Sequence, residues 1–225
     1  MNPDRYLVIV GAGPAGLATA RAYREGGGRG RVTMLTPEPY APYRRPPLTK
    51  EYLRGEASRE DLPIESGGWY EENGVELRLL TSVGSIDRQR QIVITDEGEE
   101  LSYDVCVLAT GSEPIRPPVP GGDDPEILTM RTVENSTRLQ DRVGKGDRAV
   151  VVGSGFIGCE AAASLSLRGA DVTLVGPPTL LPVGVETWPC ATSYDLDAVL
   201  PKQDVVMMLR VQLERQRAGF FPSMR

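Results

Sequence analysis

The chain has 225 residues, a net charge of −6 and 40% hydrophobic residues. This length is typical of one or two domains with a sizeable core, and the negative charge argues against nucleic acid as the main partner. No apolar run approaches the ~18 residues that a membrane-spanning helix needs, so we predict no membrane span. Histidine is missing from the sequence, which excludes Ser-His-Asp catalysis and most zinc sites, and we predict no metal site.

The cysteines indicate a reducing environment. Cys106, Cys159 and Cys190 lie far apart and form no Cys-x-x-Cys pair, so neither a disulfide framework nor a redox-active dithiol is expected. The first residues lead directly into an apolar strand, without the length that a signal peptide needs. We therefore predict a cytoplasmic protein.

The first predicted unit is a buried strand, a glycine-rich turn and a helix. The strand spans residues 7–10, and the turn has the G-x-G-x-x-G sequence over residues 11–16. Such a turn binds a pyrophosphate, because its glycines permit the tight bend, the approach of the phosphate and the packing of helix on strand. A second strand is predicted over residues 32–35, and Glu38 follows it closely enough to bind an adenosine ribose.

The middle of the chain has a proline-rich stretch followed by several short apolar segments. Residues 37–47 are rich in proline and residues 48–54 are compatible with a short helix. Short apolar segments separated by polar turns then predict an antiparallel insertion before a buried strand over 105–108. These segments span residues 75–80, 83–86, 91–95 and 100–103.

A second strand, glycine turn and helix follow a Pro- and Gly-rich linker over residues 114–125. Thr132 is predicted to cap a helix over 133–143, and a strand over 149–152 precedes the second G-x-G-x-x-G sequence, residues 153–158. Its helix is expected over 156–168, ended by a left-handed Gly169, before a strand over 172–175. Neither an acidic nor a basic residue directly follows that strand, so preference between NADH and NADPH is open.

These elements predict an α/β protein with two Rossmann-like dinucleotide-binding units, each built on a parallel sheet, and an antiparallel insertion in the first. The first of these units is predicted over residues 1–112, and the first part of the second over residues 113–176. Residues 177–225 form a tail without an assignment, although residues 205–217 have the apolar spacing of a helix.

Three sequence segments, in order, resemble one family. Residues 41–50, Ala-Pro-Tyr-Arg-Arg-Pro-Pro-Leu-Thr-Lys, together with the first glycine turn, resemble the FAD-dependent pyridine nucleotide-disulfide oxidoreductases of the ferredoxin, rubredoxin and nitrite reductase type. Residues 108–111, Leu-Ala-Thr-Gly, resemble that family's Ala-Thr-Gly segment. Residues 156–160, Phe-Ile-Gly-Cys-Glu, resemble its continuation after the second glycine turn. The resemblance covers residues 5–176. It implies that residues 1–112 are the N-terminal part of an FAD-binding domain and that residues 113–176 are the first part of an NAD(P)-binding domain.

The resemblance implies an enzyme that takes hydride from NADH or NADPH onto FAD and passes electrons to a small ferredoxin- or rubredoxin-like carrier protein. Lys50 and Glu160 are implied as a catalytic pair beside the flavin, where an ammonium stabilises negative charge on the reduced ring. The implied FAD contacts are Gly11, Gly13, Pro14, Ala15, Gly16, Glu38, Arg45, Pro46, Lys50, Val83 through its backbone, Ala109, Thr110 and Gly111. The implied contacts of the nicotinamide cofactor are Gly153, Gly155, Phe156, Ile157 and Gly158.

The resemblance also implies later segments, among them a Gly-Asp pair that binds the flavin's ribityl chain. No Gly-Asp pair follows residue 176, so we expect a truncated chain whose second sheet lacks its later strands. Two alternatives to catalysis stay open: an inactive remnant, and a module that binds a nicotinamide nucleotide without FAD. The sequence leaves the oligomeric state unknown.

Overall fold

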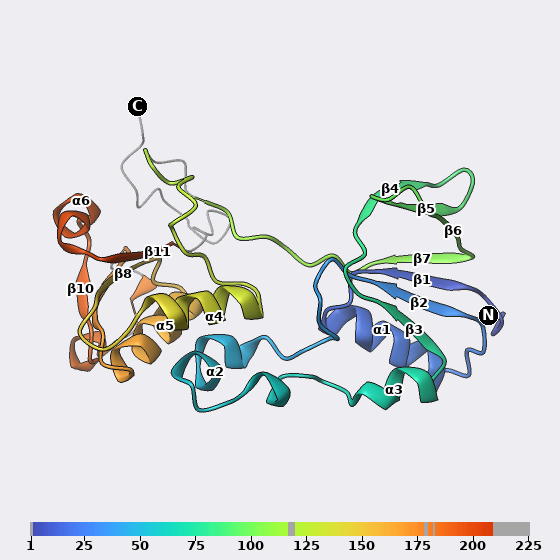
Figure 1. The fold of residues 1–225 in the computed structure, drawn as a ribbon, viewed down its shortest axis with the longest axis horizontal. Coiled ribbons are helices and arrows are strands. Elements are labelled where there is room, and N and C mark those ends of the chain that lie inside the picture. Colours follow the sequence, from blue (N-terminus) through green and yellow to red (C-terminus); the bar gives the residue numbers. More distant parts are fainter. Residues whose placement is uncertain (1, 117–119, 178–179, 182, 209–225) are drawn as a thin grey trace. The chain divides into compact units, whose positions relative to one another are not determined.

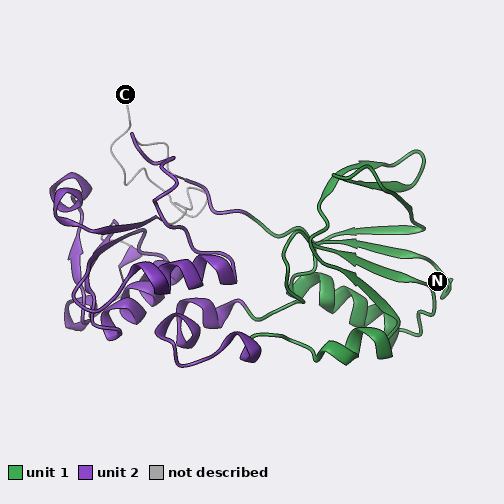
Figure 2. Ribbon diagram, viewed as in Figure 1, with its two compact units in different colours: residues 1–44, 62–112 green, residues 45–61, 113–225 purple. Residues whose placement is uncertain are grey.

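The computed structural model describes residues 2–116, 120–177, 180–181 and 183–208. Its contacts divide the chain into two compact units (Figure 2). Unit 1 comprises residues 1–44 and 62–112, and unit 2 comprises residues 45–61 and 113–225. Each unit contains a four-stranded parallel sheet, which confirms the predicted α/β class.

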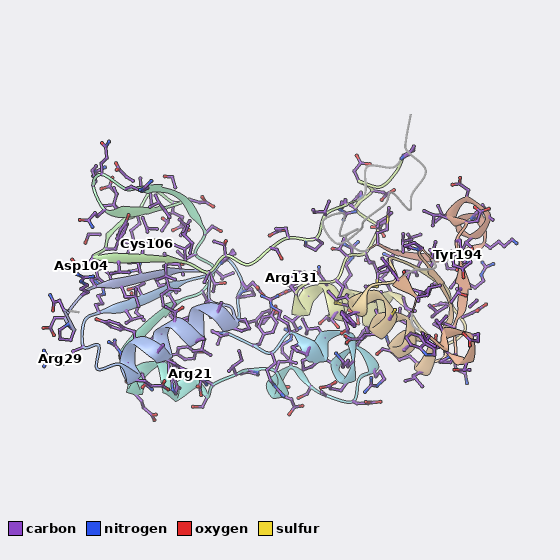
Figure 3. All side chains as sticks on the ribbon, turned by 180° about the vertical axis from the view of Figure 1, so that it is seen from behind. Arg21, Arg29, Asp104, Cys106, Arg131 and Tyr194 are labelled. Atoms are coloured by element: carbon purple, nitrogen blue, oxygen red, sulfur yellow. The ribbon has the colours of Figure 1, made fainter. Side chains whose placement is uncertain are left out.

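Unit 1 is a parallel sheet covered on both faces (Figure 1). Its strand order is β3-β2-β1-β7, the arrangement of the first half of a Rossmann fold. The start of β7 is fixed by Asp104, labelled in Figure 3, whose Oδ2 accepts a hydrogen bond of 2.7 Å from the backbone nitrogen of Tyr6. The elements are β1 (Leu7–Val10), α1 (Pro14–Glu25), β2 (Val32–Leu35), α3 (Gly67–Glu72), β3 (Val75–Arg78) and β7 (Val105–Leu108).

Strand β1 shows why the sequence forms a central strand. All four of its residues are buried, as expected for a parallel strand with both faces covered. Leu7 and Ile9 pack in a core with residues of α1 and α3, whereas Val8 and Val10 pack in a second core with residues of the antiparallel insertion. This alternation follows from the two-residue period of a strand.

The antiparallel insertion has three strands in the order β4-β5-β6. The prediction that residues 75–80 belong to it is wrong, because β3 pairs in parallel with β2 in the main sheet. Short apolar segments look alike in either setting, since the pairing partner is not encoded locally. The strands are β4 (Val83–Asp87), β5 (Ile92–Thr95) and β6 (Glu100–Ser102).

The carboxylate of Glu76, on the edge strand β3 of the parallel sheet in unit 1, accepts hydrogen bonds from three neighbouring side chains. Glu76 lies opposite the buried Thr33 of β2, whose hydroxyl donates to it over 3.0 Å. Arg31 and Arg78 also donate to the two carboxylate oxygens, over 2.7 and 2.8 Å. Burial by itself raises the pKa of Glu76, but the hydrogen bonds from Arg31, Arg78 and Thr33 outweigh burial and hold the pKa at about 2.

This lowered pKa predicts a contribution to acid unfolding. The ordinary pKa of the carboxyl is 4.5, so the contribution of Glu76 to stability is complete above that pH and is lost as the pH falls toward about 2. We expect the melting temperature of Glu76→Gln to fall less steeply than that of the wild type over this window. Thermal melts at stepped pH measure this, with Glu97→Gln, which alters an exposed turn carboxyl, as the control. Identical slopes for wild type and Glu76→Gln would contradict the assignment.

Unit 2 repeats the sheet of unit 1, with the strand order β10-β9-β8-β11. One α-helix and two 3₁₀ turns of this unit come from the segment of residues 45–61, which groups with it. The strands are β8 (Arg148–Val152), β9 (Asp171–Val175), β10 (Ala191–Ser193) and β11 (Val205–Met208). The α-helices are α2 (Glu51–Arg54), α4 (Val133–Arg142), α5 (Phe156–Leu167) and α6 (Leu196–Val199), and the 3₁₀ turns are η1 (Pro46–Thr49), η2 (Arg59–Asp61), η4 (Val185–Thr187) and η5 (Leu200–Lys202).

The prediction that this second sheet lacks its later strands is wrong. Strands β10 and β11 come from the residues after 176 and pair in parallel with β9 and β8. The helix predicted over 205–217 is wrong where the structure describes it, because residues 205–208 form β11. Val205 and Val206 are β-branched and favour a strand. Residues 209–217 lie outside the described residues.

Two helix boundaries agree with the sequence. The Thr132 side chain accepts a hydrogen bond of 3.3 Å from the backbone nitrogen of Asn135 in a capping box before α4. Gly169, after α5, has a φ of +93°, the left-handed conformation that was predicted. Among the helices of the described residues, none combines the length and the apolar character that crossing a bilayer requires.

Candidate functional site

The two glycine turns have the same local geometry in the two units. The first glycine of each, Gly11 and Gly153, has a φ of +107° and +115°. The backbone nitrogen of each donates a 2.8 Å hydrogen bond to the last residue of the neighbouring strand, Leu35 in unit 1 and Val175 in unit 2. Each turn therefore leaves its strand at the carboxyl edge of a parallel sheet, where open α/β sheets bind ligands.

Each turn leads into a helix with an open approach to its first amides. A Cβ placed on the second glycine, Gly13 or Gly155, would meet nothing within 4 Å, so the space in front of both turns is free for a phosphate. A Cβ on Gly16 would instead lie 2.1 Å from the carbonyl oxygen of Gly11, so the third glycine is required for packing. The first amides of α1 and α5 have no partner within the helix and suit an anion.

The remaining predicted residues of unit 1 lie at the ends of its strands. Ala109 follows β7, and its backbone nitrogen donates to the carbonyl of Val10 over 2.7 Å, which brings Ala109, Thr110 and Gly111 beside the first glycine turn. Glu38 follows β2, and its carboxylate accepts a 2.5 Å hydrogen bond from the hydroxyl of Tyr43. The strand ends, the open glycine turn and this acid fit the adenosine and pyrophosphate of FAD.

Val83 lies two residues beyond Thr81, whose backbone nitrogen donates to the carbonyl of Thr36 over 2.7 Å. It begins β4, and its side chain packs against the core that contains Val93 and Leu101. The side chain of Val83 is partly exposed, and the backbone contact that the resemblance implied stays a prediction.

In unit 2, hydrogen bonds from two helices hold the Pro-Pro-Leu-Thr-Lys segment. Ser136 of α4 donates to the carbonyl of Leu48, and Ser164 of α5 donates to the carbonyl of Thr49, each over 2.7 Å. Gln140 of α4 also donates to the carbonyl of Tyr52. Both serines are buried, and a buried backbone carbonyl needs such a partner. These bonds fix the backbone on both sides of Lys50.

Lys50 and Glu160 form an ion pair. The Nζ of Lys50 lies 2.7 Å from Oε2 of Glu160, and the two side chains are 40% and 33% exposed. The hydroxyl of Thr49 donates to the same oxygen over 2.5 Å. Glu160 lies in the first turns of α5, directly after the second glycine turn. The two predicted catalytic residues are thus in contact, and the ammonium remains accessible.

The other predicted residues of unit 2 lie on the same elements. Arg45 donates to the carbonyl of Arg131 over 2.8 Å, and Figure 3 labels Arg131 near the start of α4. Pro46 begins η1 and is exposed. At the start of α5, Phe156 is 84% and Ile157 is 43% exposed. Both side chains lie directly after the second glycine turn and are accessible to a ligand bound there.

The groups that hold the ion pair were not predicted from the sequence. Thr49, Ser136 and Ser164 look like ordinary polar residues, because their role depends on contacts between segments distant in sequence. One signal was available: Ser164 follows Glu160 by four residues, so the two share a face of α5, and Thr49 directly precedes Lys50.

The thiols take no evident part in this site. The three cysteines are free, and burial raises the pKa of Cys106, Cys159 and Cys190. The thiol of Cys159 donates to the carbonyl of Ser154 over 3.4 Å. A thiol with a raised pKa is mostly protonated near neutral pH and is a weak nucleophile.

The contact between Thr49 and Glu160 makes a testable prediction. Thr49→Val keeps the buried shape but removes a hydroxyl that donates to a carboxylate, so we expect a loss of about 1–3 kcal/mol in the free energy of unfolding. Urea unfolding measures the loss, and Thr49→Ser, which retains the donor, is the matched control. A Thr49→Val protein as stable as Thr49→Ser would show that this hydrogen bond contributes nothing.

Two parallel sheets, each with a glycine turn opening a helix, define a protein of the dinucleotide-binding class. A profile of the pyridine nucleotide-disulphide oxidoreductase family matches residues 5–215. The chain therefore belongs to this family.

Individual relatives agree with the family. The chain is 36% identical over 169 residues to the rhodocoxin reductase of Rhodococcus erythropolis, covering 75% of this chain and 40% of that protein. It is 34% identical to the rubredoxin-NAD(+) reductase of Pseudomonas putida, covering 75% and 44%. Among solved structures, the covalent putidaredoxin reductase–putidaredoxin complex matches with a TM-score of 0.80 and 27% identity, covering 92% of this chain and 58% of that one. The chain spans less than half the length of the two curated relatives.

Proposed function

We propose that the protein is an NAD(P)H-dependent FAD oxidoreductase that passes electrons to a small redox protein. The main support is that one chain contains the same dinucleotide-binding turn twice, at Gly11 and at Gly153, with identical strand-to-turn hydrogen bonds. Family membership and the reductases among its relatives support the same activity. FAD, when bound, accepts hydride and releases electrons one at a time.

Unit 1 is proposed to bind FAD and unit 2 the nicotinamide nucleotide. In unit 1, Gly11, Gly13 and the first amides of α1 would hold the FAD pyrophosphate, and Glu38 the adenosine ribose. In unit 2, Gly153, Gly155 and the amides at the start of α5 would hold the second pyrophosphate. The role of each turn is to orient its cofactor, because proximity and alignment supply much of the rate in hydride transfer.

Lys50 and Glu160 are proposed as the catalytic pair. The ammonium of Lys50 would stabilise negative charge on the reduced flavin, and Glu160, 2.7 Å away, would orient it and favour its charged form. Thr49 is proposed as a positioning residue, because its hydroxyl donates to the Glu160 carboxylate over 2.5 Å. The hydrogen bonds from Ser136 and Ser164 to the carbonyls of Leu48 and Thr49 hold the backbone beside Lys50 in place.

The proposed acceptor is a ferredoxin- or rubredoxin-like carrier. The relatives include a rubredoxin-NAD(+) reductase, and one structural neighbour is a reductase bound to putidaredoxin. We propose a cytoplasmic location, supported by the free cysteines. Because the matched relatives are reductases, an inactive remnant is the less supported alternative.

The flavin content of the purified chain tests the proposal. We expect FAD to copurify, or to be taken up when supplied in excess, at about one per chain, with a flavin absorbance spectrum that differs from free FAD. A folded chain that binds NADH but no FAD would instead support a nucleotide-binding module. A folded chain that binds neither would support the remnant.

A further inference from the structure

The position that usually selects between NADH and NADPH is occupied here by a glycine. In a Rossmann unit an acidic residue near the end of the second strand binds the ribose 2′-hydroxyl of NAD, and an arginine nearby accommodates the 2′-phosphate of NADP. In unit 2 that strand is β9, and Gly176 follows it directly. The sequence has no lysine or arginine from residue 176 to residue 201. Gly176 therefore offers neither charge.

The structure gives a physical reason for the glycine. The φ of Gly176 lies outside the positive range that disfavours other residues, so the backbone conformation does not require it. The lack of space beside Ser154 does require a glycine. A Cβ on Gly176 would lie 2.2 Å from the hydroxyl oxygen, 2.7 Å from the Cβ and 2.9 Å from the backbone nitrogen of Ser154. The side chain of Ser154 thus occupies the space in which a charged side chain at residue 176 would begin.

Ser154 is itself unusual for a buried polar residue. It is 2% exposed, and its hydroxyl has no hydrogen-bond partner among the described residues. Buried hydroxyls without a partner are rare and call for an explanation. Ser154 belongs to the second glycine turn, so a nucleotide bound there would bring polar atoms close to it.

We infer that Ser154 and Gly176 together make unit 2 accept NADH and NADPH with similar affinity. The hydroxyl of Ser154 can donate to a ribose hydroxyl or to a phosphate oxygen, and it can also accept. No carboxylate at residue 176 repels a 2′-phosphate, and no cation there attracts one. This inference rests on the proposed function, because it concerns the nicotinamide nucleotide that unit 2 is proposed to bind.

Calorimetric titration of the full chain with NADH and with NADPH tests the inference directly. We expect dissociation constants that agree within about tenfold, which corresponds to a small difference in binding free energy. A larger preference for either nucleotide would overturn the inference but leave the proposed function intact. If neither nucleotide binds, the proposed function fails as well, so the two failures are distinguishable.

Variants test the roles of the two residues. Gly176→Asp alone should melt at a lower temperature and bind both nucleotides more weakly, because its Cβ overlaps the Ser154 side chain. Ser154→Gly/Gly176→Asp should recover stability and prefer NADH by more than about tenfold, since the carboxylate repels the 2′-phosphate. Ser154→Gly alone is the matched control: it should bind both nucleotides more weakly, because it loses the hydroxyl, but it should keep the wild-type ratio of affinities. A double variant that folds and still binds both nucleotides equally would contradict the assignment of residue 176.

Glu186 is the competing explanation for any preference that is found. It is an exposed acid ten residues beyond Gly176 in η4. If the wild type prefers NADH and Glu186→Gln abolishes that preference, the ribose is selected by Glu186 and the inference about Ser154 and Gly176 is wrong. We expect Glu186→Gln to leave the ratio of the two affinities unchanged.

Discussion

Gly11→Ala is expected to abolish FAD binding and to lower the free energy of unfolding by about 2–6 kcal/mol. Gly11 has a φ of +107°, and a Cβ there would lie 2.2 Å from the carbonyl oxygen of Ala109. The substitution therefore combines an unfavourable backbone conformation with an overlap against backbone that cannot rotate away. Urea unfolding and the flavin content of the purified protein measure the two effects.

Gly13→Ala separates flavin binding from folding. The φ of Gly13 is −83°, which alanine tolerates, and a Cβ there meets nothing within 4 Å. We expect this variant to fold with wild-type stability, but to bind FAD at least about tenfold more weakly, because the Cβ enters the space proposed for the pyrophosphate. Undiminished FAD affinity in Gly13→Ala would show that the first glycine turn does not hold the cofactor.

Lys50→Met is expected to slow flavin reduction by about 100-fold in the FAD-loaded protein, a typical effect of removing one electrostatic stabiliser. The flavin reduction potential should fall in the same variant, because the reduced ring loses a nearby positive charge. Stability should change little, since half-exposed ion pairs contribute little to folding. Anaerobic stopped-flow mixing with NADH and a reductive titration give the rate and the potential.

Variants on both sides of the ion pair separate charge from packing. Lys50→Arg retains a cation and should keep a potential closer to the wild type than Lys50→Met does. Glu160→Gln keeps the shape of the side chain but removes the charge that orients Lys50, so we expect a smaller loss of rate than in Lys50→Met. If Lys50→Met reduces its flavin at the wild-type rate, Lys50 has no catalytic role.

The sequence predicted the parts of the fold that depend on local signals. The glycine turns, the buried strands before them and the capping residue Thr132 each have a pattern over a few neighbouring residues. The signal is local because a left-handed glycine or a helix cap is determined by its immediate neighbours. These elements were predicted at or near their observed bounds.

The sequence could not supply the strand pairings. Residues 75–78 pair with β2 across a gap of about 40 residues, and β10 and β11 join a sheet through partners far away in the chain. A three- or four-residue strand has too little periodicity to be recognised alone. Pairing with distant strands therefore determined the structure of these segments. It replaced the predicted antiparallel strand at residues 75–80 and, where residues are described, the predicted helix over residues 205–217.

In the candidate site, too, residues could be named from the sequence, but their contacts could not. Lys50 and Glu160 were inferred from a resemblance, and their 2.7 Å contact is a property of the folded unit 2. The contacts of Thr49, Ser136 and Ser164 depend on how η1 packs against α4 and α5, which no local pattern records. The close contact between the Ser154 side chain and Gly176 is likewise visible only in the folded unit.

Anaerobic addition of NADH or NADPH to the FAD-loaded chain is the most direct test of the account. We predict that the flavin absorbance is bleached by about one equivalent of nucleotide, and that it returns when an oxidised ferredoxin- or rubredoxin-like carrier is added. A chain that holds FAD but leaves it oxidised under an excess of both nucleotides would contradict the proposed hydride transfer.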